Sequence, residues 1–162
     1  MKIAVYPGSF DPPTEGHLNI IERGLNLFDK IIVVVAVNSS KNRLLTVEER
    51  VQLLREIFKK FPAVEVDSFK DELLVKYAQS RKATAILRGL RTLQDYEYEF
   101  QMALTNKKLA PAIETVFMMT EPQYAHVSST LIREVARLGG SVSGMVPNAV
   151  QKKLNKKRER KK

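Results

Sequence analysis

The sequence predicts an α/β fold: a single-domain, doubly wound, five-stranded and mainly parallel sheet with helices on both faces. Strand-like and helix-like segments alternate five times along 162 residues, a length typical of one domain. The run from Ile31 to Val37 is continuously apolar and largely β-branched, which is typical of a parallel strand covered on both faces. Right-handed crossovers then place helices on both sides of the sheet.

Each element has a local signal. A spacing of three to four residues between apolar positions marks the helices, and short β-branched runs mark the strands. A capping-box sequence at Thr46 to Glu49 starts the second helix, and Pro62 ends it. We expect strands at 2–6, 31–37, 64–66, 84–87 and 113–119. We expect helices at 15–28, 46–60, 71–82, 93–109, from 128 up to Gly139, and from Pro147 onward.

Composition excludes several kinds of chemistry. The chain has no cysteine, which excludes disulfides and thiolate sites, and its two histidines are too few for a metal site built from several histidines. No apolar run approaches the ~18 residues of a membrane span, and the chain begins directly with a strand rather than a signal peptide. We therefore expect a soluble, cytoplasmic protein with no membrane partner.

The formal charge of +9 is concentrated at the C-terminus. Residues 151–162 contain eight Lys or Arg and one Glu, a net charge of +7, which leaves +2 for residues 1–150. We place the folded domain at 1–150 and interpret 151–162 as a basic tail that continues the last helix into solvent. The alternative is a nucleic-acid-binding tail, but no aromatic residue interleaves its charges, so we expect no nucleic-acid partner. Truncation after Asn148 separates the two, because an enzyme would keep its activity.

The stretch from Tyr6 to His17 has the features of a phosphate site. Gly8 allows a sharp turn after the first strand, and Thr14 is a good N-cap for the next helix. The free N–H groups and the positive dipole end of that helix suit a phosphate. Gly16 leaves room for it, and His17 can donate a hydrogen bond to it. The plainer alternative is an ordinary strand–loop–helix turn with a surface histidine.

Polar residues also follow the other strands. Lys41 follows the second strand, Arg88 and Arg91 the fourth, and Ser128 to Thr130 the fifth. In an assumed strand order 3-2-1-4-5, the first and fourth strands flank the switch point at which doubly wound sheets bind ligands. The three cations and His17 then face one crevice, which suits two phosphorylated molecules or one with several phosphates.

Each of these residues also has a purely structural interpretation. The loop lysine, taken alone, is most simply solvated. Arg88 and Arg91 could pair with Asp95 or Glu97 in a structural network. Glu97 and Glu99 most simply form the solvent face of a helix, and the serine run could be only an N-cap.

Several motifs resemble a known superfamily. Thr14-Glu-Gly-His17 and Ser128-Ser-Thr-Leu-Ile-Arg133 look like motifs of the nucleotidylyltransferases. Gly-Ser-Phe-Asp-Pro-x-Thr-x-Gly-His, Leu-Arg-Gly-Leu-Arg and Asp95-Tyr-Glu-Tyr-Glu99 closely resemble the phosphopantetheine adenylyltransferase family. The Gly-His pair is shared widely, whereas Arg-Gly-Leu-Arg with its acidic and aromatic continuation is far more specific. The similarity runs from residue 2 to about 150 and implies a Rossmann-like fold.

The resemblance implies a reaction, a cofactor and an assembly. The reaction is reversible transfer of an adenylyl group from ATP to 4′-phosphopantetheine, which gives dephospho-coenzyme A and pyrophosphate in coenzyme A biosynthesis. Mg²⁺ is the implied cofactor, a homohexamer is the implied assembly, and we assign no residue as a metal ligand. The alternative is a sister nucleotidylyltransferase with another phosphate acceptor.

Matching positions also imply individual roles. His17, Lys41 and Arg91 are the implied catalytic residues, and His17 would stabilise the transition state. The implied contacts to 4′-phosphopantetheine are Ser9, Lys41, Leu74 and Arg88. The implied ATP-binding residues are Ser9, Phe10, His17, Gly89, Leu90, Arg91, Glu99, Tyr124, Ala125, His126, Val127, Ser128, Ser129 and Thr130.

The chemistry of the residues agrees with this reaction. The attacking phosphate is largely ionised near neutral pH, so no general base is needed. The site has to align the acceptor with the α-phosphorus and neutralise the negative charge that spreads in the transition state. Donors and cations without a nucleophilic residue suit that task.

Overall fold

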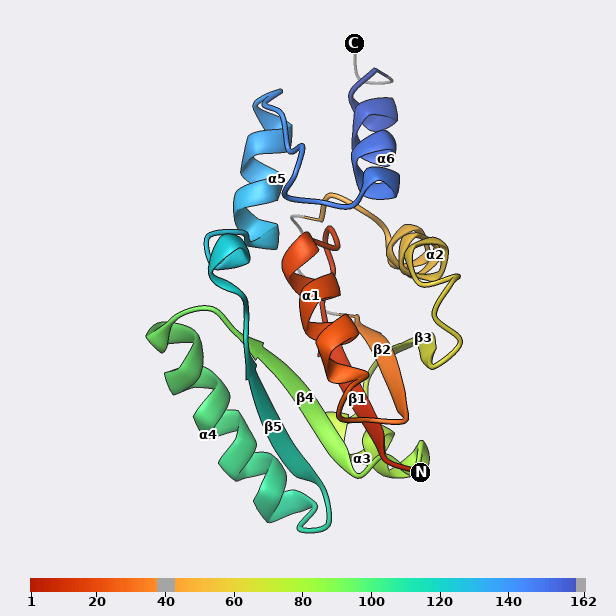
Figure 1. Cartoon of the computed structure of the whole chain (residues 1–162), viewed down its shortest axis with the longest axis vertical. Coiled ribbons are helices and arrows are strands. Elements are labelled where there is room, and N and C mark those ends of the chain that lie inside the picture. The colour runs from red at the N-terminus through yellow and green to blue at the C-terminus, as the bar shows by residue number, and fades with distance from the viewer. Residues whose placement is uncertain (38–42, 160–162) are drawn as a thin grey trace.

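The structure is a computed structural model that describes residues 1–37 and 43–159. Five parallel strands form one sheet in the order β3-β2-β1-β4-β5. This order confirms the expected doubly wound α/β fold and places β1 beside β4 in the sheet (Figure 1). The strands are β1 (Ile3–Gly8), β2 (Lys30–Ala36), β3 (Val64–Phe69), β4 (Ala85–Leu90) and β5 (Glu114–Met119).

Four of the helices begin at polar caps. Thr14, Thr46, Thr92 and Ser128 each accept a hydrogen bond from the backbone N–H three residues later, and the capping box predicted at Thr46 is present. In the part of the chain that the structure describes, no helix is long and apolar enough to cross a membrane. The helices are α1 (Glu15–Gly24), α2 (Val47–Ile57), α3 (Leu74–Ser80), α4 (Leu93–Leu109), the 3-10 turn η1 (Pro122–Tyr124), α5 (Ser129–Arg137) and α6 (Asn148–Glu159).

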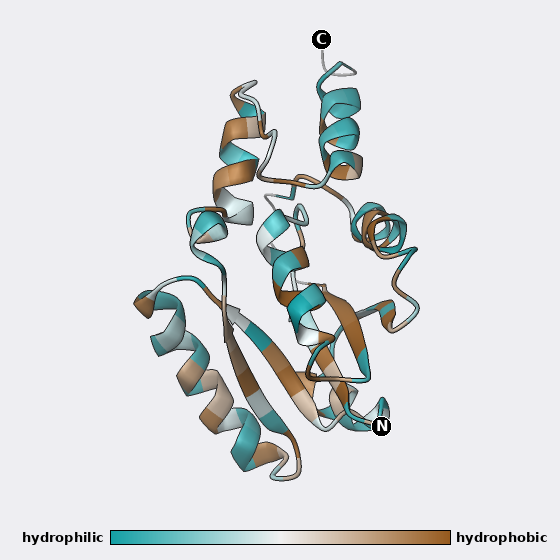
Figure 2. Cartoon of the chain, in the orientation of Figure 1, coloured by the Kyte–Doolittle hydropathy of each residue, from teal (hydrophilic) through white to brown (hydrophobic). Residues whose placement is uncertain are grey.

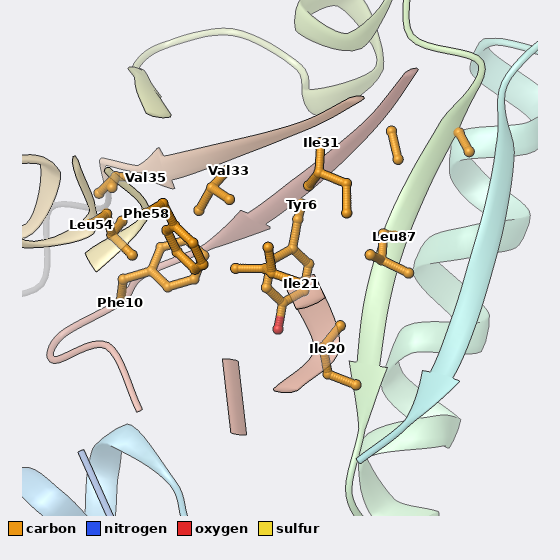
Figure 3. Packing of buried hydrophobic residues seen from close by; sticks show 12 residues of the cluster. Tyr6, Phe10, Ile20, Ile21, Ile31, Val33, Val35, Leu54, Phe58 and Leu87 are labelled. Carbon is orange, nitrogen blue, oxygen red and sulfur yellow. The ribbon is translucent and has the colours of Figure 1, made fainter. Parts of the chain in front are cut away.

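The core lies on both faces of the sheet, and alternating residues of β2 contribute to each side. Ile31, Val33 and Val35 pack with residues of α1 and α2, whereas Ile32 and Val34 pack with residues of α3. All five side chains are almost completely buried, which confirms the prediction that this strand is covered on both faces. Figure 3 shows the first of these two clusters.

A third apolar cluster joins α2, α5 and α6 beyond the carboxyl end of the sheet (Figure 1). Val150 and Leu154 of α6 are buried there together with Leu53 of α2 and Ile132 of α5. The described part of the basic segment is therefore a packed helix rather than a solvated end. Truncation after Asn148 would uncover this cluster, so we expect it to lower the stability of the domain.

α4 departs from its expected burial. The apolar residues Leu93, Tyr96, Phe100 and Ala103 lie on one side of the helix by their spacing, which is typical of a buried face, but Leu93 is 84% exposed and both aromatic rings are more than 40% exposed. The helix lies along β5 at the edge of the sheet (Figure 1), and Asn106 is its one buried residue. The periodicity identified the helix but not the face that is covered.

Candidate active site

The N-terminus of α1 opens beside the carboxyl end of β1 and is organised by Thr14 and His17. The Thr14 hydroxyl accepts a hydrogen bond from the His17 backbone N–H (3.3 Å), and the Thr14 backbone N–H donates to His17 Nδ1 (3.0 Å). These reciprocal bonds fix the orientation of the imidazole. Because Nδ1 accepts, the neutral ring carries its proton on Nε2, which is left as a donor to a ligand.

His17 is uncharged at physiological pH. Burial lowers the pKa of its imidazole to about 4, and the positive charges of Arg91 and Arg88 act in the same direction. The fully buried Phe10 packs edge-on against the imidazole, with the ring centroids 4.9 Å apart. The ring therefore offers a fixed, neutral N–H group rather than a cation.

Four carbonyl groups of the loop from Pro7 to Pro12 are each held by a side chain from another element. The pairs are Arg88 Nη1 to Pro7 O (2.9 Å), Arg50 Nη1 to Ser9 O (2.8 Å), Arg133 Nη1 to Asp11 O (2.9 Å) and Ser129 Oγ to Pro12 O (2.9 Å). Donors from β4, α2 and α5 thus fix the shape of the loop. Three of the four donors are cationic, so positive charges surround the loop at the start of α1.

The buried carboxylate of Asp11 ties this loop to the segment before α2. It accepts hydrogen bonds from the backbone N–H groups of Leu44 (3.0 Å) and Leu45 (2.8 Å). Lys41, which was predicted to act both in catalysis and on the acceptor, precedes this anchor and lies outside the described residues.

His17, Arg88 and Arg91 line one cavity of about 280 Å³, which we call the first cavity. This placement confirms the predicted convergence of His17, Arg88 and Arg91 at the carboxyl end of the sheet, whereas the placement of Lys41 stays a prediction. Other residues with predicted roles line it as well: Ser9, Gly89, Glu99, Val127, Ser128, Ser129 and Thr130. The remaining residues predicted to contact ATP do not line it: Phe10, Leu90, Tyr124, Ala125 and His126. Phe10 and Leu90 are core residues, and the roles of all five stay predictions.

Both arginines are paired with carboxylates of α4. Arg88 Nε donates to Glu99 Oε2 (2.7 Å), with a second contact between Nη2 and Oε1, and Arg91 Nε donates to Asp95 Oδ2 (3.1 Å). The expectation that Glu99 lies on the solvent face is wrong, because its side chain is only 12% exposed and bonds Arg88. Glu97 is the exposed neighbour. The pairs orient both guanidinium groups at the wall of the first cavity.

A second cavity of about 230 Å³ shares Ser9 and Arg88 with the first. Leu74, which was predicted to contact phosphopantetheine, lines this second cavity. Several further lining residues had no predicted role, among them three that recur at every fourth position on one face of α4: Tyr98, Met102 and Asn106.

The first cavity also contains residues to which sequence reasoning gave no role, among them Tyr6 and Arg133. Arg133 follows Ser129 by four residues, so that both side chains project from one face of α5 onto the loop. That spacing was a usable signal for Arg133. Tyr6 carried no such signal, because its neighbours identify it only as part of a buried strand.

The first cavity is built for anions rather than for a metal ion. Its two carboxylates, Asp95 and Glu99, are both engaged by arginines. Within residues 1–37 and 43–159, no group of three or more His, Asp or Glu side chains is arranged to hold a metal. The cavity combines guanidinium groups, helix N-termini and neutral donors, which is the chemistry of phosphate binding.

The fold matches that of the nucleotidyltransferases. The model of the Cytidylyltransferase-like family matches residues 5–135. Among solved structures, the chain is similar to a Vibrio parahaemolyticus protein for which nicotinate-nucleotide adenylyltransferase activity has been suggested. The TM-score is 0.66, over 95% of this chain and 99% of that one, and at 21% identity the likeness shows the fold alone.

Curated relatives narrow the class. The phosphopantetheine adenylyltransferases of Caldanaerobacter subterraneus subsp. tengcongensis and Carboxydothermus hydrogenoformans are 54% and 53% identical to the chain over 157 residues. These alignments cover 97% of this chain and 98% and 96% of the two relatives. The chain belongs to the phosphopantetheine adenylyltransferase family.

Proposed function

We propose that this site transfers an adenylyl group reversibly from ATP to 4′-phosphopantetheine, giving dephospho-coenzyme A and pyrophosphate, as a step of coenzyme A biosynthesis. Membership of the family supports the reaction. The observation that carries the proposal is the convergence of His17, Arg88 and Arg91 on a cavity that adjoins a second one. Two adjoining cavities with a cation at their junction suit two phosphorylated substrates.

ATP would occupy the first cavity. Arg91 and the hydroxyl groups of Ser128 and Thr130 offer donors to its phosphates, and the positive end of the α5 dipole favours anions there. Gly89 has no side chain that would project from β4 into the first cavity. An added Cβ at this position would lie only 3.0 Å from Ile20. A side chain at position 89 would therefore both clash with α1 and reduce the space for the nucleotide.

The phosphate of 4′-phosphopantetheine would lie at the junction of the two cavities, held by Arg88, Ser9 and Lys41. Its pantetheine arm would extend into the second cavity past Leu74 and Asn106. The side-chain amide of Asn106 can both donate to and accept from the amides of that arm. This arrangement gives Arg88 a role in binding the acceptor and explains why Glu99 holds it in place.

The reaction forms a bond between an acceptor phosphate oxygen and the α-phosphorus of ATP, and it breaks the bond from that phosphorus to the departing pyrophosphate. The acceptor is already ionised, so the site supplies no general base. His17 Nε2–H would stabilise charge on the α-phosphoryl oxygens, and Arg91 would stabilise the leaving group.

Mg²⁺ would enter as part of the nucleotide substrate, where it neutralises phosphate charge. The residues of the first cavity do not form a metal site of their own, because Asp95 and Glu99 are bonded to arginines. Mg²⁺ is commonly bound through substrate phosphates and water rather than by an all-protein cage. The steps assigned above to His17 and Arg91 do not depend on its position.

We also propose that the protein acts in the cytoplasm as a homo-oligomer, a hexamer by family resemblance. Apolar side chains exposed along α4 support self-association, since soluble monomers rarely expose such residues side by side. They are Leu93, Tyr96, Tyr98, Phe100, Leu104 and Leu109. The pairing of Lys153 and Lys157 with Glu49 favours a structural role of the basic segment over nucleic-acid binding.

The test is the formation of dephospho-coenzyme A by the purified protein from ATP, 4′-phosphopantetheine and Mg²⁺, followed by mass spectrometry and pyrophosphate release. CTP in place of ATP, and nicotinate mononucleotide as the acceptor, are the matched controls. Pyrophosphate release with another acceptor, but not with 4′-phosphopantetheine, would reject the proposal in favour of a sister nucleotidylyltransferase.

A further inference from the structure

Tyr6 brings a hydroxyl group to the first cavity that none of the roles above uses. The residue lies near the carboxyl end of β1, is 5% exposed, and lines the cavity together with His17, Arg88 and Gly89. Figure 3 shows its hydroxyl oxygen at the end of the ring that points away from the strand, near Ile20. Among the residues that the structure describes, this hydroxyl has no hydrogen-bond partner.

A tyrosine buried to this extent normally has a partner for its hydroxyl group, because an unpaired buried donor is costly. The Tyr6 hydroxyl oxygen is not fully buried, so a hydrogen-bond partner can reach it from the first cavity. Gly89 keeps it uncovered, since an added Cβ there would lie 3.4 Å from the Tyr6 oxygen.

The direction of the hydroxyl group is fixed by the aromatic neighbours of Tyr6. Phe10 and His17 both pack edge-on against the Tyr6 ring, with centroids 5.8 Å and 6.4 Å away. The ring therefore cannot turn its hydroxyl toward another partner without breaking the contacts that also hold His17.

The hydroxyl group stays protonated. Burial raises the pKa of Tyr6, and this effect outweighs the opposing influence of the Arg88 and Arg91 charges. A neutral O–H group therefore belongs to the same cavity as the neutral imidazole of His17 and the guanidinium groups of Arg88 and Arg91.

We propose that the Tyr6 hydroxyl donates a hydrogen bond to a phosphate oxygen of a substrate bound in the first cavity. This makes Tyr6 a further substrate-binding residue, which positions the phosphate together with His17. The inference rests on the proposed function for the identity of the substrates, either ATP or 4′-phosphopantetheine. The identification of the Tyr6 hydroxyl as the donor, and of the ligand as an anion, rests on the geometry of the first cavity alone.

The test compares Tyr6→Phe with Tyr77→Phe, a matched control in another part of the core. The Tyr77 hydroxyl donates to Asp67 Oδ2 (2.7 Å), and Tyr77 lines neither cavity. Calorimetry gives the Kd of each variant for ATP, for 4′-phosphopantetheine and for inorganic pyrophosphate, and chemical unfolding gives its stability.

We expect Tyr6→Phe to weaken the binding of at least one substrate about tenfold, as for a lost hydrogen bond to a charged group, and to keep wild-type stability. The substrate whose affinity falls is the one that Tyr6 contacts. Tyr77→Phe should do the reverse, losing stability while it keeps all three affinities.

Affinities and turnover of Tyr6→Phe within twofold of wild type would overturn the inference. A loss of stability without a loss of affinity would overturn it too, because it would reveal a partner inside the protein. A wild-type enzyme that makes no dephospho-coenzyme A, but whose affinity for ATP or pyrophosphate depends on Tyr6, would reject the proposed function and leave this inference intact.

Discussion

α4 and α6 lie in different parts of the molecule and are held there in different ways (Figure 1). α4 lies along β5, and apolar side chains are exposed along most of its length. α6 is mostly hydrophilic (Figure 2), yet it buries Val150 and Leu154 in the third cluster. Its Lys157 donates to the carbonyl of Leu44 (3.0 Å) and to Glu49 Oε2 (2.8 Å).

The neighbouring elements of a surface helix, rather than its composition, decide whether it stabilises the domain or shapes the site. α6 needs only two apolar residues, spaced four apart, because α2 and α5 provide the apolar surface that receives them. α4 directs Asp95 and Glu99 toward the arginines of the site, and its exposed apolar side chains are left uncovered by the part of the chain that the structure describes. α6 thus stabilises the domain, whereas α4 shapes the site and, in the proposed oligomer, the interface.

The largest expected effect is that of removing α6 by truncation after Asn148. The truncation uncovers the third cluster and deletes two buried side chains, and deletion of even one such side chain typically costs about 2 to 5 kcal/mol. We expect a loss of at least about 4 kcal/mol, measured by urea unfolding. Truncation after Glu159 keeps the helix and serves as the control. If the protein truncated after Asn148 unfolds at the same urea concentration as wild type, α6 does not stabilise the domain.

Single leucine substitutions sharpen the contrast between the helices. Leu154→Ala should cost about 3 kcal/mol, because it leaves a cavity in a packed cluster. Leu104→Ala changes a side chain that is 57% exposed and should cost less than about 0.5 kcal/mol in the monomer. Sedimentation should show that Leu104→Ala weakens self-association instead. Equal losses of stability in dilute protein would contradict the difference in burial.

Glu99→Gln tests the role of α4 in the site. The substitution removes the charge that holds Arg88 and should cost about 2 kcal/mol of stability, as for a charged hydrogen bond. It should also raise the KM for 4′-phosphopantetheine more than the KM for ATP, because Arg88 is assigned to the acceptor. Glu97→Gln, at the exposed neighbouring position, should match wild type in both respects. If the two variants behave alike, Glu99 does not position Arg88.

The smallest expected effect is a pH dependence of stability that arises from α6. Burial would raise the pKa of Glu49, but its hydrogen bonds with Lys157, the Thr46 backbone and Lys153 outweigh this and lower the pKa from 4.5 to about 2. A lowered pKa means that the stabilisation is complete above pH 4.5 and is lost as the pH falls toward 2. Glu49→Gln should therefore flatten the acid decline of unfolding free energy by about 1 kcal/mol. An unchanged decline would show that these ion pairs contribute nothing.

The convergence of His17, Arg88 and Arg91 could be predicted from the sequence once the strand order was assumed. Polar residues that directly follow parallel strands all lie at the carboxyl end of the sheet, whatever the details of side-chain packing. The caps at Thr14 and Thr46 were also predictable, because capping bonds form between residues close in sequence.

The features that depend on a distant partner could not be predicted. Glu97 and Glu99 carry the same charge on one helix, and only the placement of α4 decides which of them meets Arg88. The free hydroxyl of Tyr6 depends on the positions of α1 and β4. The burial of Val150 likewise depends on the residues of α2 and α5 with which it clusters.

The steady-state turnover of His17→Ala with ATP and 4′-phosphopantetheine tests directly whether the first cavity is the place of adenylyl transfer. Loss of a fixed donor to the transition state should lower kcat by about 100-fold or more, with a cooperative unfolding transition retained. A folded His17→Ala enzyme that works at the wild-type rate would contradict the assignment of this cavity as the place of adenylyl transfer.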